Sequence, residues 1–156
     1  MSIVDKIKEI LRPAPQEPDL VHPVFGEMDA EVCGDEDDFW QANIIFKPLN
    51  KEIAVNVLAG AEGPSQSQVE FYKSFESSYI NDFNLVAPSL IKEAENWSIK
   101  VEDFQSSFLF VSLTIPKLGK RDGKWELSFE CLEDANLHMF TAEIENSSVV
   151  NVRIDG

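Results

Sequence analysis

Cysteine, histidine and basic residues are scarce in this chain of 156 residues, and long apolar runs are missing. The two cysteines, Cys33 and Cys131, are far apart and lie in no Cys-x-x-Cys motif. This excludes a disulfide scaffold and predicts two free thiols. The first residues have neither the apolar core nor the cleavage site of a signal peptide, and no window reaches the ~18 apolar residues that span a bilayer. We therefore expect a cytoplasmic protein.

The motifs of common catalytic and metal sites are also missing. The sequence has no His-Glu-x-x-His, P-loop, Gly-x-Gly-x-x-Gly or Gly-x-Ser-x-Gly motif. The run "GDEDD" at residues 34–38 lacks the glycine and the closing glutamate of a calcium-binding EF-hand loop. We expect no bound metal and no cofactor, and a non-enzymatic function is favoured over an enzymatic one.

Acidic residues dominate the charge of the chain. There are 28 acids against 13 bases, for a net charge of −15. Such a balance argues against nucleic acid and anionic membranes as partners, because both are polyanions. It favours a basic protein as partner. The acids are concentrated at residues 24–63, which hold nine acids and two bases.

Four consecutive acids precede a Phe-Trp pair at the start of a predicted strand. One interpretation is a solvated turn whose charge protects a sheet edge. The other is a docking surface that mimics a polyanion, with an exposed aromatic residue as rigid anchor. Neutralising the four acids is expected to leave the stability similar or slightly raised. The residues of this hypothesis are Asp35, Glu36, Asp37, Asp38, Phe39 and Trp40.

The chain divides into three parts. Apolar residues at helical spacing predict an amphipathic helix over residues 1–12. Four prolines then indicate an extended connector over residues 13–23, since proline neither continues a helix nor joins a central strand. Residues 24–156 are expected to form a single domain.

The periodicity within this domain predicts three strands, two helices and four strands. The strands are expected near residues 24–32, 39–46, 52–58, 106–115, 124–131, 137–144 and 148–154. The helices, at about 64–80 and 87–97, form an adjacent pair. Because strands come in blocks with helices between them, we predict an α+β fold. Its antiparallel sheet, curved or split, carries the helical pair on its apolar face.

Two of the later strands allow a prediction of register. In the strand at 124–131, alternation places four residues inward: Trp125, Leu127, Phe129 and Cys131. The strand at 106–115 is apolar on both faces, which is typical of a central strand. One face is expected to carry Leu109, Val111, Leu113 and Ile115, and the other Phe108 and Phe110.

A second functional hypothesis places a pocket between the sheet and the helices. The protein would then bind a small molecule or act as an enzyme. Its polar groups would be His138, from a late strand, and Tyr72 and Tyr79, from the first helix of the pair.

Several segments together resemble a group of small acidic bacterial proteins. These segments are "HPVFGEMDAEV", "DDFWQANIIF", "KEIAVNVLAG" and "GPSQSQVEFYKSF", and the resemblance covers residues 22–97. Proteins of this group look like, or stand beside, the immunity proteins of bacterial toxin systems. The resemblance implies a protein that masks a basic toxin, and it carries no catalytic residues over to this chain.

Overall fold

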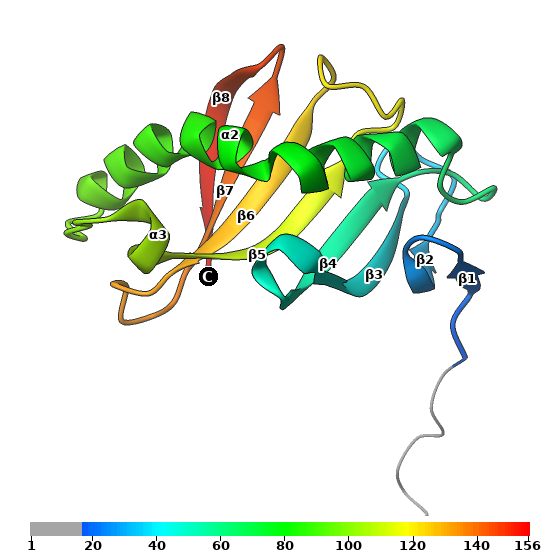
Figure 1. The fold of residues 1–156 in the computed structure, drawn as a ribbon, viewed down its shortest axis with the longest axis horizontal. Helices are drawn as coiled ribbons and strands as arrows, with labels where there is room; N and C mark the ends of the chain where they lie inside the picture. Colours follow the sequence, from blue (N-terminus) through cyan, green and yellow to red (C-terminus); the bar gives the residue numbers. More distant parts are fainter. Residues whose placement is uncertain (1–16) are drawn as a thin grey trace, which may run out of the picture.

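The computed structural model describes residues 17–156, in which one long helix crosses an open sheet of eight strands (Figure 1). The predicted helix at residues 1–12 lies outside the described residues, as does the first part of the connector. The strands are β1 (Leu20–His22), β2 (Gly26–Glu31), β3 (Phe39–Phe46), β4 (Lys51–Leu58), β5 (Phe108–Ile115), β6 (Trp125–Cys131), β7 (Met139–Glu145) and β8 (Ser148–Asp155).

The order of the strands in the sheet is their order in the chain. The seven predicted strands are present, and the four at the carboxyl-terminal end pair consecutively and antiparallel as expected. The structure also has an eighth strand, β1, which pairs with β2. It lies within residues 13–23, so the prediction of an extended connector without strands is wrong there. Pro18 and Pro23 flank this short strand. An edge position tolerates such prolines, since only one side of an edge strand needs its N–H groups.

Helix α2 (Gln66–Asn96) replaces the predicted pair of helices, which is therefore wrong. The segment at 81–86 is helical because Phe83 and Val86 extend the apolar side of the same helix. Pro88 lies inside α2 on an exposed position, where the N–H group it lacks costs least. The helix begins as predicted at Ser65, whose hydroxyl accepts the N–H of Gln68 in a capping box.

The crossover through α2 makes β4 and β5 parallel, whereas every other neighbouring pair is antiparallel. This corrects the prediction of a purely antiparallel sheet. A crossover by a helix is the usual way to join parallel strands. The Gln68 side chain fastens the two strands together: its Nε2 donates to the carbonyl oxygens of Leu58, at 2.7 Å, and of Pro116, at 3.0 Å.

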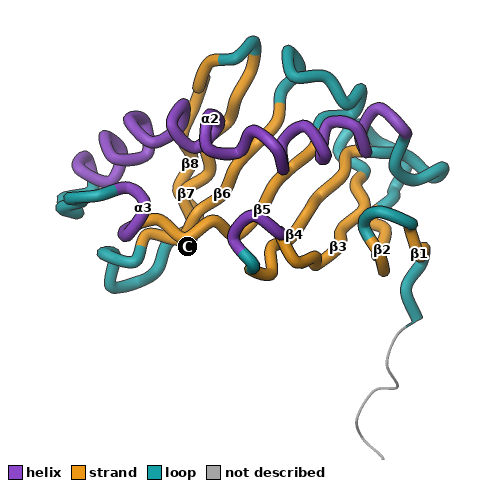
Figure 2. Tube along the Cα trace, in the orientation of Figure 1, coloured by secondary structure: helices purple, strands orange, loops and turns teal. Residues whose placement is uncertain are grey.

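The core lies between α2 and one face of the sheet, while the opposite face carries no helix of the described chain (Figure 2). The predicted inward register of β6 is confirmed, because Trp125, Leu127, Phe129 and Cys131 are all buried. The short α3 (Phe104–Ser107) and the 3-10 turn η1 (Lys47–Leu49) lie at strand ends. In residues 17–156, no helix combines the length and the hydropathy needed to cross a membrane.

The register prediction for β5 is wrong in one respect. A β-bulge lies between Phe110 and Ser112, and it shifts the alternation of the strand by one residue. As a result, four residues that were expected on opposite faces are all buried: Phe108, Phe110, Leu113 and Ile115. Leu109 and Val111 are only half-buried.

Candidate functional site

Exposed acids gather along one edge of the sheet, on β1, β2 and the segments beside them. Residues 17–46 contain nine acids and no lysine or arginine, and eight of the nine are exposed. Like charges on adjacent strands repel each other, so this clustering does not stabilise the fold. We call the surface the acidic edge, and its members are Glu17, Asp19, Glu27, Asp29, Glu31, Asp35, Glu36 and Asp37.

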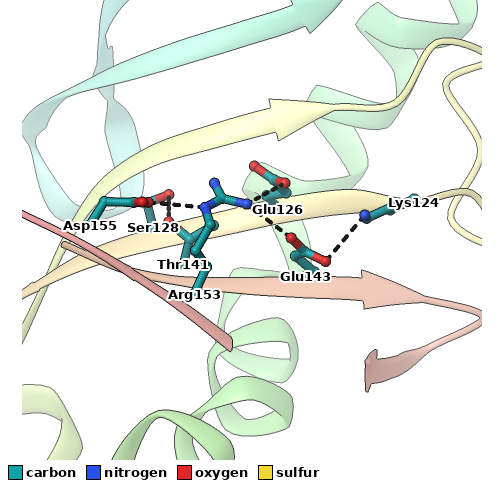
Figure 3. Close-up of polar contacts among 7 residues, drawn as sticks. All are labelled: Lys124, Glu126, Ser128, Thr141, Glu143, Arg153 and Asp155. Carbon is teal, nitrogen blue, oxygen red and sulfur yellow. Dashed lines mark hydrogen bonds and ion pairs between the residues drawn. The ribbon is translucent and has the colours of Figure 1, made fainter. Parts of the chain in front are cut away.

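The acids of the acidic edge differ from several acids on the far strands, because they form no ion pair within the described residues. None of the eight forms an ion pair with any residue in the described range 17–156. On β6–β8, by contrast, Glu143 is paired with both Lys124, at 3.2 Å, and Arg153, at 2.9 Å (Figure 3). Within residues 17–156, no ion pair therefore neutralises the negative charge of the acidic edge.

The charged residues on β6–β8 form ion pairs and hydrogen bonds with one another. Burial raises the pKa of Glu143, but hydrogen bonds from Lys124 and Asn151 and the charges of Lys124 and Arg153 together outweigh burial, so this pKa lies below its ordinary value. Arg153 also donates to Asp155, and the hydroxyls of Ser128 and Thr141 are 2.9 Å apart (Figure 3). These contacts link three strands across the face that lacks a helix. We assign them a structural role.

Asp38 differs from the three acids before it, because its carboxylate points into the protein. Its two oxygens accept the N–H groups of Cys33, at 2.7 Å, and of Gly34, at 3.0 and 3.2 Å. Gly34 has a φ of +88°, a backbone conformation that glycine adopts readily. The hydrogen bond from Cys33 is the main reason why the pKa of Asp38 is lowered. Asp38 therefore holds the loop of the acidic edge in place, which argues against the expectation that neutralising it together with residues 35–37 leaves the stability similar or slightly raised.

Replacing Asp38 with asparagine is expected to lower the melting temperature at neutral pH, since an amide offers one oxygen where the carboxylate offers two. The folded pKa of Asp38 lies below its unfolded value, so its stabilisation is present above the unfolded pKa and is lost as the pH falls through the folded pKa. The deficit of the variant should therefore shrink in acid. Melting curves from neutral pH to strong acid, with Asp37→Asn as exposed control, test this; equal melting temperatures at neutral pH would contradict it.

The two aromatic residues of the docking hypothesis are not alike. Trp40 is buried, and its indole N–H donates to the carbonyl oxygen of Gly60 at 2.8 Å. Its ring belongs to the core, so Trp40 is not the exposed anchor that the docking hypothesis requires. Phe39 is half-buried at the start of β3, opposite Glu31.

A cavity of about 410 Å³ opens between α2, α3 and the sheet. Its wall is mainly aromatic, and Lys51 and Gln105 are the polar residues that line it beside the Tyr79 hydroxyl. The aromatic residues of the wall are Tyr79, Phe83, Phe104, Phe108 and Phe110. Apart from Tyr79, these were not proposed as pocket residues from the sequence. The high number of phenylalanines, eleven, was the available signal.

The three residues of the predicted pocket lie in three different places. Tyr79 lines the cavity described above, whereas Tyr72 lines a separate hollow of about 430 Å³ and is hydrogen-bonded to Glu76. His138 lies just before β7, not in the strand, where its Nδ1 meets the carboxylate of Asp134. Its ring packs 5.5 Å from that of Trp97, between centroids. The structure therefore does not assemble the three side chains into one site.

Comparison with protein-family models, with curated proteins and with solved structures finds no match to this chain. The residues from 17 to 156 contain no group of three or more histidine, cysteine, aspartate or glutamate side chains that is able to hold a metal ion. Of the two thiols, Cys33 is exposed and Cys131 is buried, and both are free. Two features thus remain as candidate sites: the acidic edge and the aromatic cavity.

Proposed function

We propose that this protein is a non-enzymatic interaction protein that uses its acidic edge to bind and mask a basic protein, as an immunity protein masks a toxin. One observation carries the proposal: eight exposed acids share one edge that has no base between residues 17 and 46. Some acids elsewhere in the described chain, such as Glu143 and Asp82, are paired with arginine or lysine. Unpaired charge at one edge is costly for folding and useful for attracting a cation.

The acidic residues in the loop at residues 32–38 have two different roles: some hold the backbone of the loop, and others are exposed for binding. Asp38 binds the backbone of the loop, and Asp35 accepts the N–H of Asp37 at 2.9 Å. These bonds fix the backbone, so that the exposed carboxylates of Glu36 and Asp37 are presented in a defined arrangement. A preorganised charged surface loses less conformational freedom on binding than a mobile one. The charge accelerates association and selects among partners, and a basic cleft covered in this way is closed to its substrate.

Two variants with equal charge changes test the proposal. The edge variant carries Glu27→Gln, Asp29→Asn, Glu31→Gln, Glu36→Gln and Asp37→Asn. The control variant carries Glu52→Gln, Glu70→Gln, Glu95→Gln, Asp122→Asn and Glu145→Gln. All ten acids are exposed, and none has a side-chain hydrogen bond or an ion pair within the described residues. The edge variant keeps Asp19, which accepts the N–H of Ala30, and Asp38.

The binding partner to measure is the protein encoded beside this gene, or a basic protein captured from the native cell and then purified. We expect the edge variant to bind it at least about tenfold more weakly than wild type, mostly through slower association, and the control variant to bind nearly as well as wild type. Raising the salt concentration should reduce the difference, because it screens exposed charge. Equal weakening by both variants would show that net charge, and not the acidic edge, governs binding.

A further inference from the structure

The aromatic cavity has a shape that its own side chains do not fill. Phe83 is one of its lining residues, and its ring centroid lies 5.3 Å from that of Tyr79 and 5.1 Å from that of Phe110. On the far side, Phe104 stacks on Phe108 at 5.2 Å but stays 6.3 Å from Phe83. The rings thus pack along the wall of the cavity. A volume of about 410 Å³ is within the range of roughly 300–1,000 Å³ typical of small-molecule sites.

The mouth of the cavity is apolar as well. Leu49 of η1 and Ile80 of α2 line it and are 42% and 56% exposed. Side chains of this kind are normally scattered singly on a protein surface. Here both line the same cavity, whose interior is aromatic. A ligand with an apolar body would cover both residues as it enters.

One charged residue marks the polar end of the site. Lys51, the first residue of β4, lines the cavity and is half-buried. It forms no ion pair within residues 17–156, although the chain has 28 acids. A lysine that lines a cavity and has no carboxylate partner there favours an anionic ligand group. Gln105, on α3, adds an amide that donates or accepts a hydrogen bond.

From this geometry we infer that the cavity binds a small amphipathic carboxylate. The apolar body lies among the rings of Phe83, Phe104 and Phe110, and the carboxylate receives hydrogen bonds from Lys51. Burial of the apolar body supplies most of the binding free energy, and the ion pair fixes the orientation. The lining of this site comes from η1, β4, β5 and the helices, and shares no residue with the acidic edge, so the inference does not depend on the function proposed for that edge.

Octanoate is the probe, with octan-1-ol and octylammonium as analogues that share its alkyl chain. Titration calorimetry of wild type should give a dissociation constant in the millimolar range or below for octanoate, and weaker binding of the other two. Lys51→Gln is expected to weaken the binding of octanoate by about tenfold and to leave the affinity for octan-1-ol unchanged. Ile80→Lys should strengthen octanoate binding and Ile80→Glu should weaken it. Leu132→Glu is the control, because Leu132 is 50% exposed and lies outside this cavity.

Methyl signals in a carbon–proton NMR spectrum locate the ligand independently of the variants. Octanoate should shift the methyl signals of Leu49, Ile80 and Leu109, which line the cavity, and leave that of Leu132 in place. Absence of octanoate binding at millimolar concentration would overturn the inference, and so would shifts confined to other methyl groups. Equal binding of all three alkyl probes, with no effect of Lys51→Gln, would refute the assignment of an anionic ligand.

Discussion

Replacing Phe75 with alanine is expected to lower the free energy of unfolding by about 3–5 kcal/mol, the usual cost of removing a buried phenylalanine ring. Phe75 is fully buried on the face of α2 that meets the sheet. Its ring centroid lies 5.6 Å from that of Phe46, 5.8 Å from Phe110 and 6.2 Å from Trp125, so it joins β3, β5 and β6 to the helix. A cavity left there is bordered by rigid rings that relax little.

Urea denaturation followed by circular dichroism measures this loss. Phe75→Leu keeps most of the apolar volume and should cost less than the alanine variant. Ser74→Ala, at the exposed neighbouring position of the same helix, should change the free energy of unfolding by less than about 0.5 kcal/mol. A cost below about 1 kcal/mol for Phe75→Ala would mean that α2 does not pack on the sheet as the structure describes.

Replacing Arg121 with alanine is expected to cost about 2–3 kcal/mol, slightly less than the roughly 3–5 kcal/mol seen when a fully buried ion pair loses one partner. Arg121 comes from the loop between β5 and β6 and reaches over α2. Its Nη1 donates to both carboxylate oxygens of Asp82, at 2.9 and 3.0 Å. Its guanidinium carbon lies 4.9 Å from the ring centroid of Phe71 and 5.0 Å from that of Trp125. The residue thus fastens the loop to the helix by charge and by stacking.

The Arg121 variant should also show a distinct dependence on pH. Burial raises the pKa of Asp82 more than the charge of Arg121 lowers it, and without Arg121 the pKa rises further. A carboxyl whose folded pKa is above its unfolded value binds a proton more readily when folded, so acidification favours the folded state. The stability deficit of Arg121→Ala should therefore shrink as the pH falls from neutral. A deficit that is constant with pH would show that Asp82 is not its cause, and so would an equal cost of Arg121→Ala in the wild-type and Asp82→Asn backgrounds.

The strands were predictable because their alternation is local. In β6, Trp125, Leu127 and Phe129 alternate with polar residues and are buried as expected. The bulge in β5 was not predictable, since that strand is apolar on both faces and its pattern fits either register. The second helix expected at about residues 87–97 is the continuation of α2, because Pro88 lies inside this helix and its apolar side continues through Phe83 and Val86. The parallel pairing of β4 and β5 can be predicted only if residues 66–96 are taken as one helix that crosses the sheet between the two strands.

The candidate sites were predictable to different degrees. Composition located the excess of acid near β2 and its loop, because charge clustering is a property of the sequence itself. The inward role of Asp38 depends on the turn at Gly34, which brings two N–H groups to one carboxylate. The cavity depends on the approach of α3 to the middle of α2, and residues 97–103 lie between the end of α2 and the start of α3. Periodicity carries no information about such a contact.

Site-resolved NMR with a lysine-rich peptide tests the central claim, that the acidic edge is the surface that attracts a cationic protein. Backbone amide signals of residues 17–37 should shift most, and the edge variant should lose these shifts while the control variant keeps them. Signals near the paired acids Glu126 and Glu143 should remain almost unchanged. Shifts spread evenly over Glu52, Glu70, Glu95 and the acidic edge would contradict the claim, because the peptide would then respond to net charge alone.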